Sequence, residues 1–208
     1  MKQPRHSSNW LDVVMIRHAT TDWNEAGRIQ GTCDISLNPN GRAEASSWKI
    51  EATGFRWISS PLKRALDTAH LMGASGVETE PRLTEMSWGS WEGRTLVELR
   101  AELGPTMTHN EAKGLDFLPA GGESPREVLN RLRSWIDDVS KRSVPCIAVT
   151  HKGVIRALLA EATGWDMTGK SPCRLNWKCA HRFQIHGRTG EVRLFEPNLS
   201  LVKHQSNA

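Results

Sequence analysis

Short apolar runs and amphipathic stretches alternate along most of this 208-residue chain. Three runs rich in β-branched and apolar residues predict buried strands: 12–16 (DVVMI), 55–60 (FRWISS) and 145–150 (PCIAVT). Five stretches are predicted to be helical: about 43–50, 61–73, 95–103, 125–141 and 151–163. This alternation is typical of an α/β fold, and we predict a three-layer sandwich whose mostly parallel central sheet is flanked by helices.

Turn and breaker residues predict where these elements begin and end. Ser60 and Pro61 are expected to open one helix, Gly73 to close it, and Ser124 with Pro125 to open another. A weak strand is expected near Val77, and the runs RFQIH and VRLFE flank GRTG as a β-hairpin would. The other segments are expected to be a flexible arm at 1–11, a loop at 19–41, and a lid or covering region at 86–125 that is irregular after the helix at 95–103.

Length and composition narrow the class of protein. A chain of 208 residues supports a single domain, 1–208. The net charge of +4 comes from basic residues that are scattered among acidic ones, so we expect no nucleic-acid partner. The apolar run near the start is too short for a signal peptide or a membrane span, which predicts a cytoplasmic protein without a membrane partner. The four cysteines lack metal-binding spacing, and we expect free thiols, no metal and no cofactor.

One stretch matches the phosphate-binding loop of nucleotide-hydrolysing enzymes. Residues 164–171 read GWDMTGKS and fit G-x-x-x-x-G-K-[ST]. Such a loop needs a strand before it and a helix after it, but a helical pattern precedes Gly164, and Pro172 follows Ser171 at once. We therefore predict an ordinary loop after a helix, without nucleotide chemistry.

Basic and imidazole side chains follow three of the predicted strands. Arg17 and His18 follow the first strand, Arg64 lies on the helix after the second, and His151 with Lys152 follows the third. The carboxyl ends of parallel strands meet at one crevice, so these groups should form one cationic pocket. Guanidinium groups, together with N–H groups at the starts of the helices near 61 and 152, suit a phosphate group.

The same residues suggest phosphoryl transfer. A neutral histidine can act as a nucleophile when one ring nitrogen is held by a hydrogen bond, and nearby positive charge favours the neutral form. His18 is the candidate nucleophile, while Arg17, Arg64 and His151 would stabilise the charge on the phosphoryl oxygens. Glu85, before a glycine-flanked loop, is the candidate acid for the leaving alcohol and then base for water.

Five segments in this order resemble the histidine phosphatase superfamily, which includes cofactor-dependent phosphoglycerate mutase. They are RHATTDWN, GRIQGTCDISLNPNG, SSPLKRALDTA, EMSWGSWEG and THKGVIR, between about Val13 and Arg156. The resemblance implies that His18 is phosphorylated, that Glu85 donates the proton and that Arg17, Arg64 and His151 form the phosphate pocket. It also implies substrate or phosphate contacts for Asn24, Gln30 and Gly31.

The chain departs from the family pattern at two positions. Ala19 and Lys152 stand where the family usually has glycine. Ala19 adds only a methyl group and is expected to be tolerated. Lys152 is expected to place a positive charge at the rim of the pocket, among the residues that bind the substrate.

The sequence thus predicts a metal-independent phosphoric monoester hydrolase of the histidine acid phosphatase type, acting on a small phosphorylated metabolite. A phosphoglycerate mutase is the nearest alternative, but the mutases carry a longer insertion than the 65 residues between Glu85 and His151. A non-catalytic protein that binds a phosphorylated ligand is the other alternative. Such a protein would be expected to lack one of the five key residues, and all five are present. The oligomeric state is left open.

Overall fold

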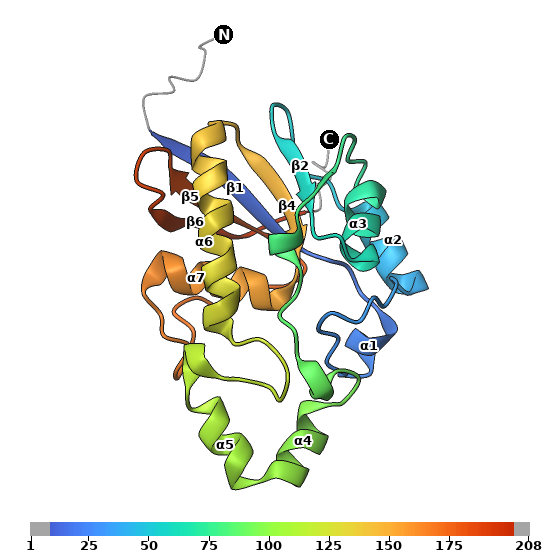
Figure 1. The fold of residues 1–208 in the computed structure, drawn as a ribbon. Coiled ribbons are helices and arrows are strands. Elements are labelled where there is room, and N and C mark those ends of the chain that lie inside the picture. Colours follow the sequence, from blue (N-terminus) through green and yellow to red (C-terminus); the bar gives the residue numbers. More distant parts are fainter. Residues whose placement is uncertain (1–8, 202–208) are drawn as a thin grey trace.

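A single mixed sheet organises the computed structural model, which describes residues 9–201 (Figure 1). The six strands lie in the order β3-β2-β4-β1-β5-β6. Their bounds are β1 (Trp10–Arg17), β2 (Arg56–Ser59), β3 (Glu78–Thr79), β4 (Cys146–Thr150), β5 (Ala180–His186) and β6 (Val192–Leu199). The first four strands pair in parallel, whereas β5 and β6 form an antiparallel edge beside β1.

Helices cover both faces of this sheet, as predicted. In the described part of the chain they are α1 (Asp22–Glu25), α2 (Pro39–Ser47), α3 (Lys63–Leu71), α4 (Leu96–Leu103), α5 (Pro105–Glu111), α6 (Pro125–Arg142) and α7 (Lys152–Thr163). Figure 1 places α6 and α7 on one face and α2 and α3 on the other. The predicted three-layer α/β class is confirmed.

The buried strands β1 and β4 divide the core into two halves. Val13 and Met15 of β1 pack with α6 and α7, whereas Val14 and Ile16 pack with α2 and α3. Alternate residues of a strand point to opposite faces, so a strand covered on both sides must be apolar throughout. This explains why the apolar run at 12–16 is continuous instead of alternating with polar residues. The packing fixes the carboxyl end of β1, where the candidate site begins.

Three of the predicted element boundaries were wrong. The helix expected at 43–50 is α2, which begins at Pro39 because Asn38 caps it, accepting a hydrogen bond from Gly41 N at 2.8 Å. Ser60 and Pro61 do not open α3. That helix begins at Lys63, and its N-cap Leu62 makes no side-chain capping bond. The predicted arm at 1–11 ends earlier, because Trp10 and Leu11 pair with β5, while residues 1–8 lie outside the described range.

The region 86–125 lies beyond the carboxyl ends of the parallel strands (Figure 1). It was expected to be irregular after residue 103, but it contains the short helix α5. Trp91, Leu99 and Met107 form a small core of their own there, apart from the two halves of the main core. Of the helices in residues 9–201, none combines the length and apolar character needed to cross a membrane.

Candidate functional site

His18 is held at the carboxyl end of β1 by its backbone and by its ring. Its backbone N–H donates to Thr150 O of β4 at 2.9 Å, which continues the pairing of the two strands. Its Nδ1 lies 2.7 Å from the carbonyl oxygen of Ala19. A carbonyl oxygen can only accept, so Nδ1 carries the proton and Nε2 of the neutral ring keeps a free lone pair. Ala19 N in turn donates to Thr68 Oγ1 at 3.0 Å, which fixes the turn that carries this carbonyl.

The surroundings of His18 favour its neutral form. Its side chain is buried, and burial is the largest influence that lowers its pKa well below 6.5. The positive charges of Arg17 and Arg64 lower the pKa further, and only the hydrogen bond to Ala19 opposes them. An uncharged imidazole with a free lone pair is the form that can act as a nucleophile.

Two arginines present donors at the same place from different elements. Arg64 of α3 is fully buried, and its two terminal nitrogens donate to Cys33 O at 2.6 Å and Gly31 O at 2.7 Å. Its Nε and the Nε of Arg17 are buried without a hydrogen-bond partner. Buried donors without partners cost free energy, so their presence indicates where a ligand supplies acceptors.

His151 lies behind His18, with the two ring centroids 5.2 Å apart. Its Nε2 is 2.8 Å from Ser60 Oγ, whereas its buried Nδ1 has no partner. When the Ser60 hydroxyl donates to Nε2, Nδ1 carries the proton and becomes a further donor in need of an acceptor. Burial lowers the pKa of His151 well below 6.5, and the charge that His18 carries when protonated and the charges of Arg64 and Arg17 lower it further.

The loop after α1 is held against the site by a carboxylate that the sequence analysis did not select. Glu92 accepts hydrogen bonds from Thr32 N at 2.8 Å, Cys33 N at 3.1 Å and Trp88 N at 3.1 Å. Gly31 has a φ of +51°, and a Cβ there would lie 2.0 Å from Glu92 Oε1. Only glycine fits this close approach. Glu92 therefore fixes the two carbonyl groups that orient Arg64.

Glu85 comes from the segment between Leu83 and the turn at 86–95. Its carboxylate accepts hydrogen bonds from Met86 N at 2.9 Å and from Gly153 N at 3.0 and 3.3 Å. Burial raises the pKa of this carboxyl above 4.5, and the hydrogen bonds and the charges of Arg64 and Arg17 oppose that shift only in part. Desolvation thus extends the protonated acid form to higher pH.

Most of the predicted site residues line one open cavity of about 670 Å³. Its walls include Arg17, His18, Arg64, Glu85, Asn24, Gln30, Gly31 and Lys152. His151 is not among the lining residues because it lies behind His18. Asn24 also closes the first turn of α1, since its Oδ1 accepts from Thr21 N at 3.2 Å. The structure therefore brings the predicted residues together, with His151 supporting them from below the surface.

Two features predicted around the site turned out differently. The starts of α3 and α7 were expected to offer free N–H groups to a phosphate. One N–H group at each start is instead bonded within the protein, since Lys63 N donates to Asp34 Oδ1 at 2.8 Å and Gly153 N donates to Glu85. The expected helix cap Ser60 faces His151, because its backbone N–H donates to Val149 O and holds it at the strand end.

The stretch GWDMTGKS is a loop, as predicted. Gly164 ends α7 in the left-handed conformation with a φ of 68°, and residues 164–179 contain neither a helix nor a strand. Trp165 Nε1 donates to Thr168 O, and Thr168 N donates to Asp166 Oδ1, so the loop closes on itself. Without a helix after the glycines, no N-terminal dipole is aimed at a phosphate.

Three supporting residues were missed in the sequence: Thr68, Ser60 and Glu92. Thr68 and Ser60 lie in SSPLKRALDTA, and Glu92 lies in EMSWGSWEG, so the segments that carry the resemblance contain all three. The tertiary structure is needed to reveal their contacts with Ala19, His151 and the loop at 32–33, because these partners are distant in the sequence. Within residues 9–201, no group of three or more His, Cys, Asp or Glu side chains is arranged to hold a metal ion.

Comparison with known proteins identifies the family. The model of the histidine phosphatase superfamily (branch 1) matches residues 13–197, and the chain belongs to this superfamily. It is 33% identical over 176 residues to a metal-independent phosphoserine phosphatase of Arabidopsis thaliana, covering 78% of this chain and 73% of the relative. It is also 33% identical over 178 residues to a glucosyl-3-phosphoglycerate phosphatase of Mycolicibacterium vanbaalenii, covering 76% and 78%.

The fold is likewise that of solved phosphatases. The phosphoserine phosphatase of Entamoeba histolytica, solved with 3-phosphoglyceric acid, superposes with a TM-score of 0.76 at 28% identity. The match covers 91% of this chain and 98% of that one. These three relatives are small-metabolite phosphatases, which supports the same class of activity for this chain.

Proposed function

We propose that this protein hydrolyses a small phosphorylated metabolite, a phosphomonoester, through a phosphohistidine formed on His18. One observation carries the proposal. The proton on Nδ1 of His18 is fixed by Ala19 O, so Nε2 keeps its lone pair, and Arg17 and Arg64, whose buried Nε donors have no partner, line the same cavity. A nucleophile next to buried, unsatisfied cationic donors is the arrangement that phosphoryl transfer requires.

In the first step, the lone pair of His18 Nε2 attacks phosphorus and the bond from phosphorus to the ester oxygen breaks. Arg17, Arg64 and His151 Nδ1–H donate to the non-bridging oxygens. Glu85, which lines the same cavity, gives its proton to the leaving oxygen, and an alcohol departs. The raised pKa of Glu85 favours the protonated carboxyl that this step uses.

In the second step, the Glu85 carboxylate accepts a proton from water, and the water oxygen attacks the phosphoryl group. The bond from phosphorus to Nε2 breaks, its electron pair returns to the imidazole, and inorganic phosphate leaves. Glu85 is again protonated and His18 again neutral. Neither step uses a metal ion, because guanidinium and imidazole groups stabilise the phosphoryl oxygens. The other site residues, Asn24, Gln30, Gly31 and Lys152, are assigned to substrate and phosphate binding.

Rapid-quench labelling tests this proposal. Wild-type protein mixed with a ³²P-labelled aryl phosphate in EDTA should form an acid-labile, base-stable phosphoenzyme and release phosphate. His18→Ala should abolish both, while circular dichroism and thermal melting confirm that it folds. Phosphate binding without turnover would favour the non-catalytic alternative, and phosphoryl exchange between two phosphoglycerates would favour the mutase. Strict dependence on added divalent metal would overturn the metal-free mechanism.

A further inference from the structure

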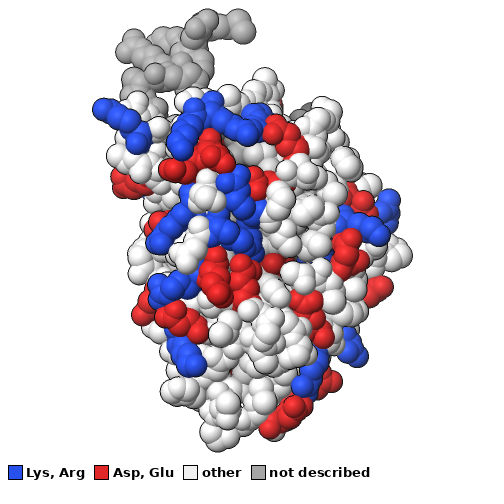
Figure 2. All heavy atoms as spheres, in the orientation of Figure 1, with Lys and Arg blue, Asp and Glu red and all other residues white. Residues whose placement is uncertain are grey.

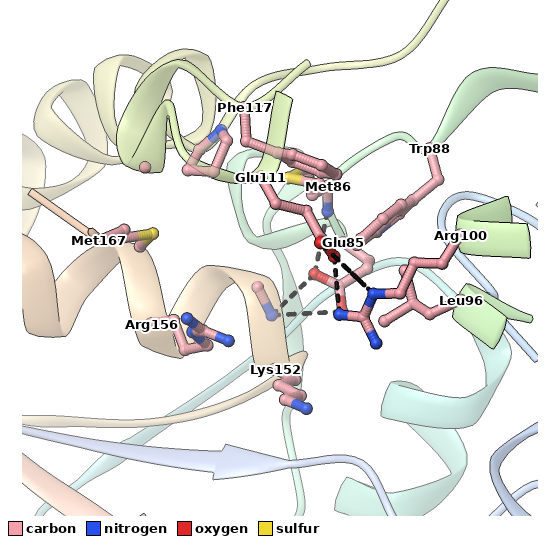
Figure 3. A pocket seen from close by; sticks show the side chains of 13 residues that line it. Glu85, Met86, Trp88, Leu96, Arg100, Glu111, Phe117, Lys152, Arg156 and Met167 are labelled. Atoms are coloured by element: carbon pink, nitrogen blue, oxygen red, sulfur yellow. Dashed lines mark hydrogen bonds and ion pairs between the residues drawn. The ribbon is translucent and has the colours of Figure 1, made fainter. Parts of the chain in front are cut away.

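A second cavity of about 310 Å³ adjoins the phosphate pocket on the far side of Glu85. Glu85, Trp88, Leu96 and Lys152 line both spaces, so a ligand in one reaches the other past the candidate acid. Figure 3 shows Glu85 at the centre of this chamber, bonded to the backbone of α7. In the proposed first step, the leaving alcohol must come close to Glu85 to receive a proton from that carboxyl. The alcohol would then lie in this chamber.

One side of the chamber is apolar. Phe117 packs against Trp88 with ring centroids 5.4 Å apart, and Met86 and Leu96 also line the chamber, whereas Met167 lies on the same side as Arg156 (Figure 3). In Figure 3, Phe117 and Trp88 lie on the side of the chamber opposite Arg156. Such a surface favours the carbon skeleton of an alcohol over a highly hydrated sugar.

The other side carries two cations on α7. Lys152 and Arg156 are four residues apart on the helix, so they share a face, where like charges repel. Within residues 9–201, neither forms an ion pair with an acidic side chain. Arg156 lies 5.2 Å from the ring centroid of Trp165, and Lys152 Nζ lies 5.6 Å from that of Trp177. These ring faces position the cations and leave their N–H donors free.

The remaining charges at the chamber are already engaged. Arg100 of α4 pairs with Glu111 of α5 at 2.7 Å, which closes the outer side of the chamber (Figure 3). Glu85 bonds to Gly153 N. Its charge acts on Lys152, but in the protonated form that the proposed first step uses, Glu85 leaves both cations without a counter-ion. Burial lowers the pKa of both, and each would be stabilised by a bound anion.

We propose that this chamber binds the leaving alcohol and that Arg156, assisted by Lys152, binds a carboxylate on that alcohol. The substrate class would be phosphomonoesters of small carboxylic acids with an aliphatic or aromatic skeleton. A carboxylate fits because the guanidinium group donates to its two oxygens in parallel. It also carries only one negative charge, which suits a chamber that Glu111 lines as well. This inference rests on the proposed phosphatase function and extends it to the substrate.

A matched pair of substrates tests the chamber: 3-carboxyphenyl phosphate and phenyl phosphate. Wild-type protein should prefer the carboxylated ester by about tenfold or more in kcat/KM, as expected for a charge-assisted hydrogen bond. Arg156→Gln should bring that ratio close to one, Lys152→Gln should lower it partly, and Arg156→Lys should retain part of it. Arg188→Gln, which removes a positive charge from the hairpin turn, should leave the ratio as in the wild type. A wild-type ratio near one, or a ratio unchanged in Arg156→Gln, would overturn the proposal.

Binding separates this proposal from the phosphatase mechanism. 3-Carboxybenzylphosphonate and benzylphosphonate resemble the two substrates but cannot be hydrolysed, so calorimetry measures their binding without turnover. A preference for the carboxylated phosphonate that Arg156→Gln removes would support the subsite even if no ester were hydrolysed. Hydrolysis of both esters with equal binding of both phosphonates would instead support the phosphatase and reject the subsite.

Discussion

The Glu85 carboxylate is held by the backbone N–H of Gly153, at 3.0 Å from Oε1 and 3.3 Å from Oε2. A Cβ at position 153 would lie 2.4 Å from Oε1, so the residue after Lys152 has to be glycine for this contact to form. Lys152 stands where the family usually has glycine, and this difference leaves Glu85 in place. A side chain at position 153 would instead displace the Glu85 carboxylate. This contact ties the candidate acid to the helix that follows His151.

Gly153→Ala should consequently lower turnover of an alkyl phosphate without unfolding the protein. The loss should approach the roughly 10²–10⁴-fold that general acid catalysis contributes. Gly187→Ala is the matched control, because its added Cβ would meet only ordinary contacts, the nearest at 3.4 Å. Steady-state kinetics and thermal melting of both variants check this. Full activity in Gly153→Ala would mean that the carboxylate does not depend on the contact.

Glu85→Gln should show a loss that depends on the leaving group. Protonation matters most for a basic alkoxide and least for an activated aryl oxide, which departs as an anion. We expect a loss of about 10²–10⁴-fold with an alkyl phosphate and a distinctly smaller one with an activated aryl phosphate. Single-turnover measurements isolate formation of the phosphoenzyme. Equal losses with both substrates would show that Glu85 only organises the pocket.

Glu92→Gln should weaken phosphate binding, although Glu92 is not among the residues that line the phosphate cavity. Its carboxylate fixes Thr32 N and Cys33 N, and this loop provides the carbonyl groups that orient Arg64. An amide nitrogen cannot accept these bonds, so we expect a loss of about 1.5–3 kcal/mol in unfolding free energy. The inhibition constant of inorganic phosphate should rise about tenfold. Glu102→Gln, which breaks a surface pair with Arg94, should change neither measurement appreciably.

Lys170→Ala should leave kcat and KM within about twofold of the wild type, as is usual for an exposed residue far from the chemistry. Lys170 is exposed in the loop after α7 and does not line the phosphate cavity. The measurement uses the same aryl phosphate assay as the other variants. A loss of several orders of magnitude would return GWDMTGKS to consideration as a phosphate loop.

How far the sequence predicts this molecule depends on the range of each interaction. The strands were found because a strand covered on both faces must be apolar, as in Val13 to Ile16, and Gly164 was found because helix ends have local signals. The function of Ser60 was missed because a serine before a proline also suits a helix start, and its partner His151 lies 91 positions away. Glu92 was missed for the same reason, since its partners in the loop that orients Arg64, Thr32 and Cys33, lie 60 and 59 positions earlier.

The pH dependence should reveal the opposite shifts of His18 and Glu85. The pKa of His18 is lowered, so the neutral nucleophile persists to pH values below 6.5. The pKa of Glu85 is raised, so the protonated acid persists to pH values above 4.5. The protein should therefore retain activity toward an alkyl phosphate below pH 6.5. Its kcat/KM for that substrate should decline as pH rises through the Glu85 pKa.

The ratio of wild-type to Glu85→Gln activity, measured at each pH, isolates the carboxyl group. Ionisation of the substrate, whose second phosphate pKa is about 6, affects both proteins equally and cancels in this ratio. The ratio should be high in acid and should fall with a midpoint above 4.5, because only the wild type loses a proton there. With an activated aryl phosphate the ratio should stay nearly flat, since that leaving group needs no proton. A midpoint at or below 4.5 would mean that burial does not raise the pKa of Glu85, and the acid role would lose its electrostatic support.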